Sequence, residues 1–551
     1  MLEFAAVFRP QRPLGASLAL LLIAAGCTKA GTATNGRVNA WTHPHILIYA
    51  SGGDINTLNP HLSQMIEVGR IGQLTMAWLT RVGSRNQIVP ELATEVPTAT
   101  NGGVSKDGLT ITYHLRKGVK WSDGAPFDVD DVVFSTKVVL NPANDEAGRQ
   151  GWDRIVRIDE PDKSTIVYHL NKPYSPFVET FFSTAGANPC ILPKHLLAQY
   201  RNINNVPYNS LPVGIGPFKV KRWDRGEQVL LEANEMYWRG RPKLDRIVFK
   251  VIPDRNTLLS QMEAHQLDMW DLATGNYLAR ASAIDGYTRL EVPSYSWEHV
   301  DFNLTNPILK DPTVRQALRL GWNRRARLEK IAHGLGTLAD SPTPITAPYT
   351  VSKPLVPYDP SRANKILDSD GWKIAADGVR ERNGQRMSFT FAVYSGAPDT
   401  DNDIELLRSD WRKIGVTFNV KHYPVQQFFA PLQEGGIAYS SNKWDIETFW
   451  WASDVIGDYS PIYGCDAFPP NGQNNVRWCN ATANAAMQSL YRHYDQGSRN
   501  ADVKTIVDEF YNDVPAVVQD QRIDVYVYNK DLKNFHPNST TPFDDFMNVD
   551  V

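Results

Sequence analysis

Val119-Lys120-Trp121-Ser122-Asp123-Gly124-Ala125-Pro126-Phe127 is the stretch of this chain that says most about its fold. Ser122, Asp123 and Gly124 are residue types that favour a tight turn, and Trp121 before them is a candidate core anchor. The acidic pair Asp130-Asp131 follows and leads into an apolar run. Acidic residues favour the first turn of a helix because the helix dipole is positive there. The stretch therefore predicts a turn followed by a helix, and it marks the fold rather than a ligand site.

Outward from this block, short strands and helices alternate along the chain, as in α/β proteins. The spacing predicts strands at 46–49, 110–115, 229–233, 247–252, 415–420 and 525–528, and helices at 314–328 and 404–414. We expect two lobes, with one crossing between them near residues 290–300 and a return near residue 520.

Bulk composition excludes several classes of protein. The chain has 551 residues, more than the roughly 250–300 residues of a single core, so we expect more than one domain. Its formal charge of −3 is unlike the basic surface of a nucleic-acid-binding protein. Four tryptophans gather late in the sequence, where they could wall a ligand cavity or belong to a large core: Trp444, Trp450, Trp451 and Trp478.

The sequence lacks enzyme signatures. It contains no Walker A loop, no Gly-x-Ser-x-Gly elbow and no His-Glu-x-x-His motif. The run from Gly334 to Ala339 fits a dinucleotide fingerprint, but a predicted helix precedes it where a strand is required, and a proline-rich loop follows. We therefore expect no catalytic residues, no cofactor and no metal site. An exported hydrolase is the remaining alternative outside the binding proteins.

The N-terminus predicts export. Arg9 and Arg12 precede an apolar run that is too short to span a bilayer but suits a signal peptide over residues 1–26. Ala24-Ala25-Gly26-Cys27 resembles a lipobox, although leucine is usual where Ala24 stands. We expect Cys27 to be lipidated, residues 27–43 to form a polar tether, and the protein to sit at a membrane in the periplasm or at the cell surface. A plain secretory signal is the alternative.

Three further cysteines allow one disulfide. Cys465 and Cys479 could close a short loop in an oxidising compartment, with Cys190 left buried and unpaired. Two unpaired thiols are the alternative.

From about residue 44 to 540 the chain resembles the family 5 solute-binding proteins of ABC importers, which include oligopeptide-, dipeptide- and nickel-binding proteins. The block at 119–127 carries the resemblance, preceded by Pro90-Glu91-Leu92-Ala93. Further blocks follow in family order: 214–219, 311–318, Gly371-Trp372, 414–416 and 513–515. One departure is Ile215, which stands where threonine or serine is usual.

The resemblance implies an α/β fold, a periplasmic-binding-protein-like two-lobed clamp of type II, in the large cluster with an extra subdomain. Lobe I would comprise residues 44–77, 206–295 and 521–551, the extra subdomain 78–205, and lobe II 296–520. It also implies a monomer that captures peptides in a closing cleft and delivers them to permease subunits with separate ATPases. An oligosaccharide or another small solute is the alternative ligand, since Trp450 and Trp451 could stack on sugar rings.

The resemblance also implies site residues. Trp451-Ala452-Ser453-Asp454 resembles a Trp-x-x-Asp stretch whose aspartate holds the peptide α-ammonium group, with Asp458 as a rival. Asp54 and Thr57 resemble residues of a loop near the ligand backbone. The alternatives are a solvated loop aspartate beside a core tryptophan, and for the early loop a turn closed by its own side chain.

Two departures from the family pattern concern residues expected to contact the ligand. Basic residues expected before Trp451 are replaced by Glu447, Thr448 and Phe449. Tyrosines expected near the last crossing are replaced by residues 519–522, where Arg522 is a candidate for a compensating positive charge.

Overall fold

The structure is a computed structural model that describes residues 39–185, 189–271, 275–395 and 398–551. The predicted signal peptide (1–26), Cys27 and the tether up to residue 38 lie outside the described residues. Among the helices of the described part, none is long and apolar enough to cross a membrane.

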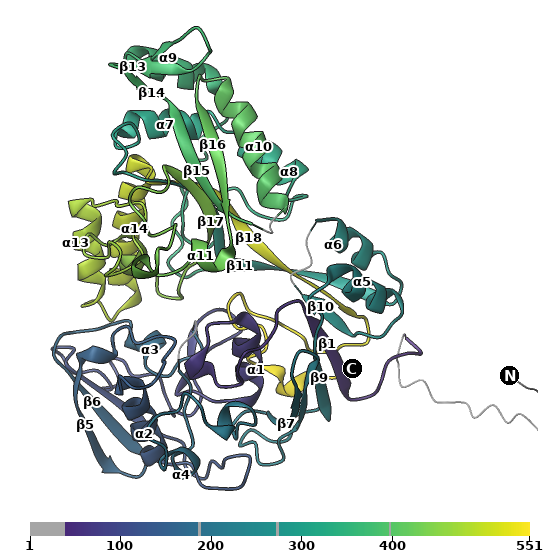
Figure 1. The fold of residues 1–551 in the computed structure, drawn as a ribbon. Helices are drawn as coiled ribbons and strands as arrows, with labels where there is room; N and C mark the ends of the chain where they lie inside the picture. The colour runs from purple at the N-terminus through teal and green to yellow at the C-terminus, as the bar shows by residue number, and fades with distance from the viewer. Residues whose placement is uncertain (1–38, 186–188, 272–274, 396–397) are drawn as a thin grey trace, which may run out of the picture.

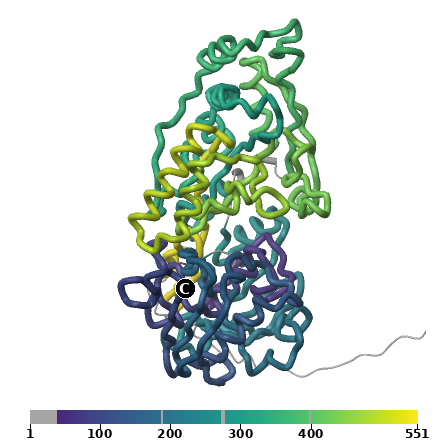
Figure 2. Tube along the Cα trace, turned by 90° about the vertical axis from the view of Figure 1, so that its left-hand side faces the viewer, coloured from purple at the N-terminus to yellow at the C-terminus, as the bar shows by residue number. Residues whose placement is uncertain are grey.

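A ten-stranded mixed sheet runs through both lobes (Figure 1), in the order β16-β15-β17-β11-β18-β10-β1-β9-β8-β7. Two neighbouring inner strands, β11 (Tyr287–Phe302) and β18 (Ala516–Asn529), are long and antiparallel and pass from one lobe to the other. They lie where the sequence predicted the two crossings. Figure 2 shows the two lobes one above the other.

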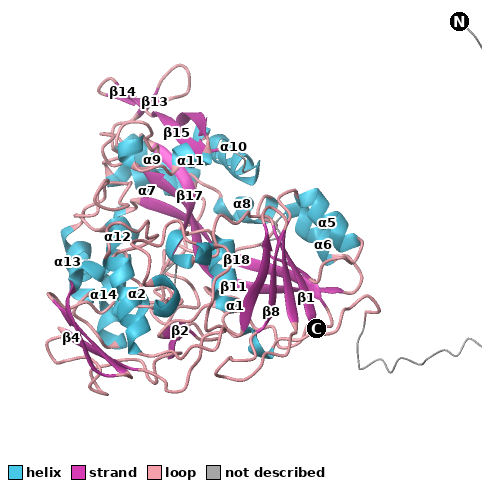
Figure 3. Ribbon diagram, turned by 60° about the horizontal axis from the view of Figure 1, so that its bottom comes forward, coloured by secondary structure: helices cyan, strands magenta, loops and turns pink. Residues whose placement is uncertain are grey.

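Lobe I contains the part of the sheet that begins near the N-terminus. Its strands are β1 (Ile46–Ser51), β7 (Phe218–Asp224), β8 (Gln228–Ala233), β9 (Arg246–Val251) and β10 (Met269–Asp271). Its helices are η1 (Pro60–Leu62), α1 (Ile66–Thr75), α5 (Arg255–Glu263), α6 (Gly275–Ser282) and η5 (Phe546–Asn548). Helices α5 and α6 pack beside the strands (Figure 3).

The extra subdomain has its own hydrophobic core and a three-stranded sheet in the order β4-β6-β5. Its strands are β2 (Thr80–Val82), β3 (Ile88–Pro90), β4 (Thr110–His114), β5 (Ile155–Asp162) and β6 (Thr165–Leu170). Its helices are α2 (Val129–Leu140), η2 (Trp152–Arg154), α3 (Phe177–Thr180) and α4 (Lys194–Leu197). The chain returns to lobe I through η3 (Pro207–Asn209).

The block at 119–127 forms the predicted turn and helix start. Trp121 is fully buried, and its indole N–H donates to Asp131 over 3.2 Å. Helix α2 begins at Val129, where Asp128 and Asp131 form a capping box. Asp131 is therefore more than a helix-start charge, because it also connects the helix to the tryptophan of the turn.

Removing the turn carboxylate should weaken the fold modestly. Asp123 accepts a hydrogen bond from the Ala125 N–H over 3.1 Å and lies 2.9 Å from His195. We expect Asp123→Ala to lower the free energy of unfolding by about 1 kcal/mol, since one hydrogen bond is lost and the half-exposed ion pair adds little. Urea denaturation measures this, with the exposed Glu160→Ala as control. Equal midpoints for the two variants would contradict the assigned role.

The return of the chain to lobe I needs glycine. In Gly214-Ile215-Gly216, a Cβ on Gly214 would lie 1.8 Å from the Thr75 carbonyl oxygen, and one on Gly216 would lie 2.6 Å from the Leu74 carbonyl oxygen. The turn packs this closely on the end of α1, so the two glycines are required by close approach.

Lobe II holds the other end of the ten-stranded sheet. Its strands are β12 (Lys373–Ile374), β13 (Arg380–Arg382), β14 (Gln385–Arg386), β15 (Ser388–Tyr394), β16 (Thr417–Tyr423) and β17 (Ile446–Ala452). Its helices are α7 (Pro312–Leu320), α8 (Arg324–Lys330), α9 (Pro360–Ser369), α10 (Pro398–Arg412), α11 (Val425–Phe428), η4 (Leu432–Glu434), α12 (Ser460–Tyr463), α13 (Ala481–Leu490) and α14 (Gln496–Asp513).

The single helix predicted over 314–328 was wrong. The structure has two helices, α7 and α8, separated at Gly321-Trp322-Asn323. Asn323 caps the second helix by accepting a hydrogen bond from the Ala326 N–H over 3.0 Å. Asparagine favours this N-cap position, and the apolar periodicity continues across the break, so spacing alone concealed it.

Candidate functional site

A pocket of about 350 Å³ lies between the lobes. Lobe I contributes residues from 60 to 73 and from 539 to 542, the extra subdomain contributes Trp78, Thr184 and Ala185, and lobe II contributes residues from 450 to 455. The two crossing strands supply the floor, with residues 294–296 of β11 and Arg522, Asp524 and Tyr526 of β18. A second cavity, of about 490 Å³, is lined by Arg81, Ser84, Lys243 and the C-terminal segment 534–549, with no lining residue from lobe II. Only the first of these two cavities would change shape when the lobes move apart.

The two adjacent tryptophans of β17 face opposite sides of the sheet. Trp450 lines the pocket and is 39% exposed. Trp451 points the other way, with its ring 5.0 Å from the Phe449 ring and 6.3 Å from that of His299. Side chains alternate along a strand, so the two residues cannot share a face. The structure therefore does not bring Trp451 into the pocket, and the expected stacking pair reduces to Trp450.

Asp454 reaches the pocket, but its own loop occupies its carboxylate. Oδ1 accepts hydrogen bonds from the backbone N–H groups of Ile456 (3.1 Å), Gly457 (2.5 Å) and Asp458 (3.0 Å). Oδ2 accepts a further one from Asp458 over 3.1 Å. Burial, followed by the charge of Asp458, raises the pKa of Asp454 to about 7, although these hydrogen bonds act to lower it.

This raised pKa predicts that the protein loses stability as pH rises. Between the ordinary pKa of 3.8 and about 7, the folded state keeps the Asp454 proton that the unfolded state releases. Stability therefore falls across this interval, by on the order of 4 kcal/mol. Asp454→Asn removes the ionisation and keeps Oδ1 as an acceptor. Denaturation midpoints at pH 4.5 and 7.5 should differ less in this variant than in the wild type, and an equal difference would contradict the prediction.

The remaining predicted ligand residues lie outside the pocket lining. Asp458 accepts hydrogen bonds from the Ser460 N–H (2.9 Å) and hydroxyl (2.5 Å), which fixes the start of α12. Asp54 is exposed and accepts a hydrogen bond from the N–H of Ile55 over 2.7 Å. Thr57 accepts one from the Asn59 N–H over 3.1 Å. Asp54 and Thr57 make the local turn contacts that the alternative interpretation of the early loop described.

The sequence reasoning named Arg522 as a candidate positive charge but missed the other charged residues of the pocket. Arg522 makes a 2.9 Å ion pair with Glu298, and its guanidinium lies 5.4 Å above the Trp450 ring. Asp524 lies two residues further along the same face of β18. Arg70 of α1 also lines the pocket, paired with Asp271 and donating to the Tyr49 hydroxyl over 2.8 Å. Alternation of polar residues at 520, 522 and 524 in a strand was the available signal.

Comparison with known proteins places the fold. The model of the bacterial extracellular solute-binding proteins, family 5 (middle region), matches residues 87–470. This chain belongs to that family. The predicted α/β, two-lobed fold class is thereby confirmed.

Three relatives of this family 5 protein differ in what their names say they bind. The oligopeptide-binding protein AppA of Bacillus subtilis is 25% identical over 489 residues, covering 85% of this chain and 84% of its own. Heme-binding protein A of Haemophilus influenzae is 28% identical over 392 residues, covering 67% and 69%. The crystal structure of NikZ from Campylobacter jejuni in complex with Ni(L-His) has a TM-score of 0.76 and 26% identity, covering 93% of this chain and 100% of its own.

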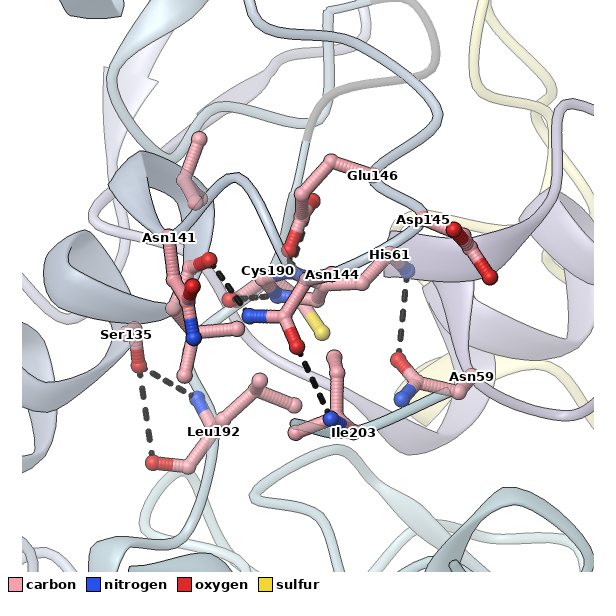
Figure 4. Close-up of polar contacts among 12 residues, drawn as sticks. Asn59, His61, Ser135, Asn141, Asn144, Asp145, Glu146, Cys190, Leu192 and Ile203 are labelled. Carbon is pink, nitrogen blue, oxygen red and sulfur yellow. Dashed lines mark hydrogen bonds and ion pairs between the residues drawn. The ribbon is translucent and has the colours of Figure 1, made fainter. Parts of the chain in front are cut away.

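A buried ion pair supports the pocket wall of this solute-binding protein (Figure 4). The Nδ1 of His61, in η1, lies 2.9 Å from Glu146 of the extra subdomain, and its Nε2 lies 2.8 Å from the Cys190 carbonyl oxygen. The exposed side-chain fractions of His61 and Glu146 are 0% and 1%. Burial alone would lower the pKa of His61, but the Glu146 carboxylate and the Cys190 carbonyl raise it well above its usual value. Pro60 and Ser63, on either side of this contact, line the pocket.

The cysteines form one disulfide, as the sequence allowed. Cys465 and Cys479 form a disulfide with a Cα–Cα distance of 4.7 Å, and Cys190 is free and buried. Within the described ranges, no group of three or more His, Cys, Asp or Glu side chains is arranged to hold a metal ion.

Proposed function

We propose that this protein is the substrate-binding component of an ABC importer, which captures short peptides between its lobes and delivers them to permease subunits driven by separate ATPases. The observation that carries the proposal is the pocket of about 350 Å³ lined by both lobes and floored by the crossing strands. This volume lies at the lower end of the roughly 300–1,000 Å³ of small-ligand sites, which favours a short ligand. The similarity to the oligopeptide-binding protein AppA supports peptides as the ligand class.

Capture requires the lobes to open and close. Hydrogen bonds between the extra subdomain and lobe II hold the two together in the closed arrangement. Ser175 donates from its N–H to the Tyr491 carbonyl oxygen (2.9 Å) and from its hydroxyl to that of Leu490 (2.7 Å). The Tyr494 hydroxyl donates to the Gly108 carbonyl oxygen over 3.0 Å. These contacts close one side of the cleft. Ligand exchange would break them as the lobes rotate about β11 and β18.

An oligosaccharide is the less favoured ligand. Sugar recognition by stacking would use exposed aromatic faces, and of the two tryptophans considered only Trp450 lines the pocket. The Arg522 guanidinium already lies over that ring. The charged floor favours a ligand that carries charges of its own.

The rest of the proposal concerns the cell. We propose that residues 1–26 direct export, that Cys27 carries the lipid anchor, that residues 27–43 form the tether, and that the protein acts as a monomer outside the cytoplasm. We also keep the division into lobe I, extra subdomain and lobe II at the predicted boundaries.

Native mass spectrometry of gently purified full-length protein tests the ligand class. We expect co-purified masses that match short peptides and disappear on partial unfolding. A short-peptide library should also stabilise the protein, by about 2.7 kcal/mol for a ligand at 100 times its Kd. If only sugars or only metal chelates stabilise the protein, that class replaces peptides as the proposed ligand. Turnover of model peptides would favour the hydrolase alternative.

A further inference from the structure

The extra subdomain and lobe II meet along a seam outside the ligand pocket. Helix α3 and the residues before it lie against the loop after β17, the end of α13 and the start of α14 (Figure 1). The Tyr174 N–H donates to the Tyr494 hydroxyl over 2.9 Å. The Arg154 guanidinium lies 4.7 Å from the ring centre of Tyr174 and 5.1 Å from that of Tyr491. The seam is therefore a specific contact between two bodies that must separate when the cleft opens.

Glu179 of α3 is the buried acid of this seam. It is 6% exposed, and its carboxyl group accepts a hydrogen bond from the backbone N–H of Val455. Val455 belongs to lobe II and lies in the loop that the Asp454 carboxylate holds together. That loop lines the pocket, whereas Glu179 does not. Glu179 therefore joins the extra subdomain to a wall of the ligand site without reaching the ligand itself.

Acidic groups outnumber cationic groups around Glu179 in the part of the chain that the structure describes. Glu179 faces Asp454, Asp458 and one cation, Arg499 of α14. The second cation, Arg154, faces Asp458. The other titratable groups that face Glu179 are phenols, which are uncharged near neutral pH: Tyr174, Tyr295 and Tyr349. Three carboxyl groups against two guanidinium groups leave one buried negative charge in excess, which binding of a proton would remove.

Glu179 is the acid of this group whose surroundings depend on closure. Asp454 and Asp458 accept hydrogen bonds from their own loop, and these contacts do not cross the seam. The hydrogen bond from Val455 to Glu179 does cross it. Burial, followed by the charge of Asp454, raises the pKa of Glu179 well above its usual value, although Arg499 and the Val455 N–H act to lower it.

Opening the seam would return the Glu179 carboxyl group to water, where its ordinary pKa is 4.5. The closed arrangement therefore binds the proton more tightly than the open one. This contribution to closure is complete below pH 4.5 and is lost as pH rises through the raised value of the closed arrangement.

The seam is incompletely packed. A cavity of about 280 Å³ remains between Phe177 and Val178 on α3 and Val455, Ile456 and Arg499 of lobe II. Permanently packed interiors hold few voids larger than a water molecule. The cavity therefore supports a contact that opens and closes.

We propose that Glu179, in its protonated form, latches the extra subdomain to lobe II, so that closure of the cleft takes up a proton and ligand affinity falls as pH rises. Glu179 acts here as a positioning residue, through the loop at 454–456, and does not touch the ligand. The inference rests on the proposed capture function and adds its regulation by pH.

Glu179→Gln tests the latch, because the amide keeps an oxygen acceptor for the Val455 N–H but cannot take up a proton. The probe is a pool of di- and tripeptides with uncharged side chains, titrated calorimetrically at pH 5.5, 6.5 and 7.5. The affinity of Glu179→Gln relative to wild type should rise about tenfold from pH 5.5 to 6.5. Titration of the peptides themselves affects both proteins equally. A ratio that stays constant with pH would show a merely structural role and would overturn the inference.

Two further variants separate the proton from the packing of the seam. Tyr494→Phe removes seam hydrogen bonds but no titrating carboxyl group, so it should weaken binding by the same factor, roughly 3- to 10-fold, at each pH. Glu160→Gln, at an exposed position of the same subdomain, should behave as wild type. If Asp454→Asn flattens the pH dependence and Glu179→Gln does not, the proton is held by Asp454 and the inference is overturned.

Hydrogen exchange of the ligand-free protein tests the latch without any peptide. The segment 174–180 includes the Ser175 N–H, which donates across the seam to the Tyr491 carbonyl oxygen. After correction for the intrinsic pH dependence of exchange, its protection should fall with pH in wild type and stay constant in Glu179→Gln. Equal pH profiles overturn the inference whether or not a peptide binds. If the profiles differ and no peptide pool binds, the proposed ligand class falls while the latch stands.

Discussion

Glu146→Gln is expected to lower the free energy of unfolding by about 3 kcal/mol, because it leaves the buried His61 without its counter-charge. Both side chains are almost fully enclosed, and His61 holds its second nitrogen against the Cys190 carbonyl. The loss falls at the low end of the range for broken buried pairs, since the imidazole can release its proton. Chemical denaturation at pH 6 measures the effect.

The pH dependence distinguishes this pair from a neutral packing contact. The folded pKa of His61 is raised, so its contribution is complete below the unfolded value of about 6.5 and is lost as pH rises through the folded value. Wild type should therefore lose stability from pH 6 to pH 8 by more than Glu146→Gln does. Glu160→Gln, at an exposed position of the same subdomain, is the matched control. Parallel losses in all three proteins would argue against a charged His61.

Local chemistry predicted the scaffold well. The turn after Trp121 and the acidic start of α2 are stabilised by contacts between residues at most ten positions apart. Both could therefore be predicted from the local sequence. The crossings near 290–300 and 520 also lie where the distribution of strands and helices along the sequence suggested them. The break between α7 and α8 was not, since one capping side chain interrupts an unbroken apolar spacing.

The pocket was harder to predict because it depends on register. Strand alternation alone shows that Trp450 and Trp451 face opposite ways, but which one faces the cleft is decided by pairing with β11. The pocket floor depends on a bulge in β11 opposite Arg522, and no local sequence pattern predicts this bulge. The sequence identified Asp454 as a pocket residue. It could not show that backbone N–H groups of the same loop donate to the Asp454 carboxylate, because these contacts depend on the folded backbone.

Arg327→Met is expected to destabilise the protein by about 3–5 kcal/mol, because it leaves two buried carboxylates without their cation. Arg327 of α8 pairs with Asp520 of β18 and, over 2.9 Å, with Asp403 of α10. All three side chains are at most 9% exposed. Asp520 precedes Arg522 by two residues, so the triad also fixes the lobe II end of the strand that carries Arg522 into the pocket lining.

The loss of stability caused by Arg327→Met should increase with pH. Burial raises the pKa of Asp520 to about 7 and that of Asp403 to about 6 even though Arg327 acts to lower both. Without the arginine both values rise further, so the folded state retains protons that the unfolded state releases, and stability falls as pH increases from about 5 to 8. Thermal denaturation at these two values measures the difference, with Arg325→Met, an exposed neighbour on the same helix, as control. Adding Asp403→Asn and Asp520→Asn to Arg327→Met should restore most of the loss at pH 8, since no buried charge then remains unpaired. If this triple variant is as unstable as the single one, the arginine acts through packing rather than charge.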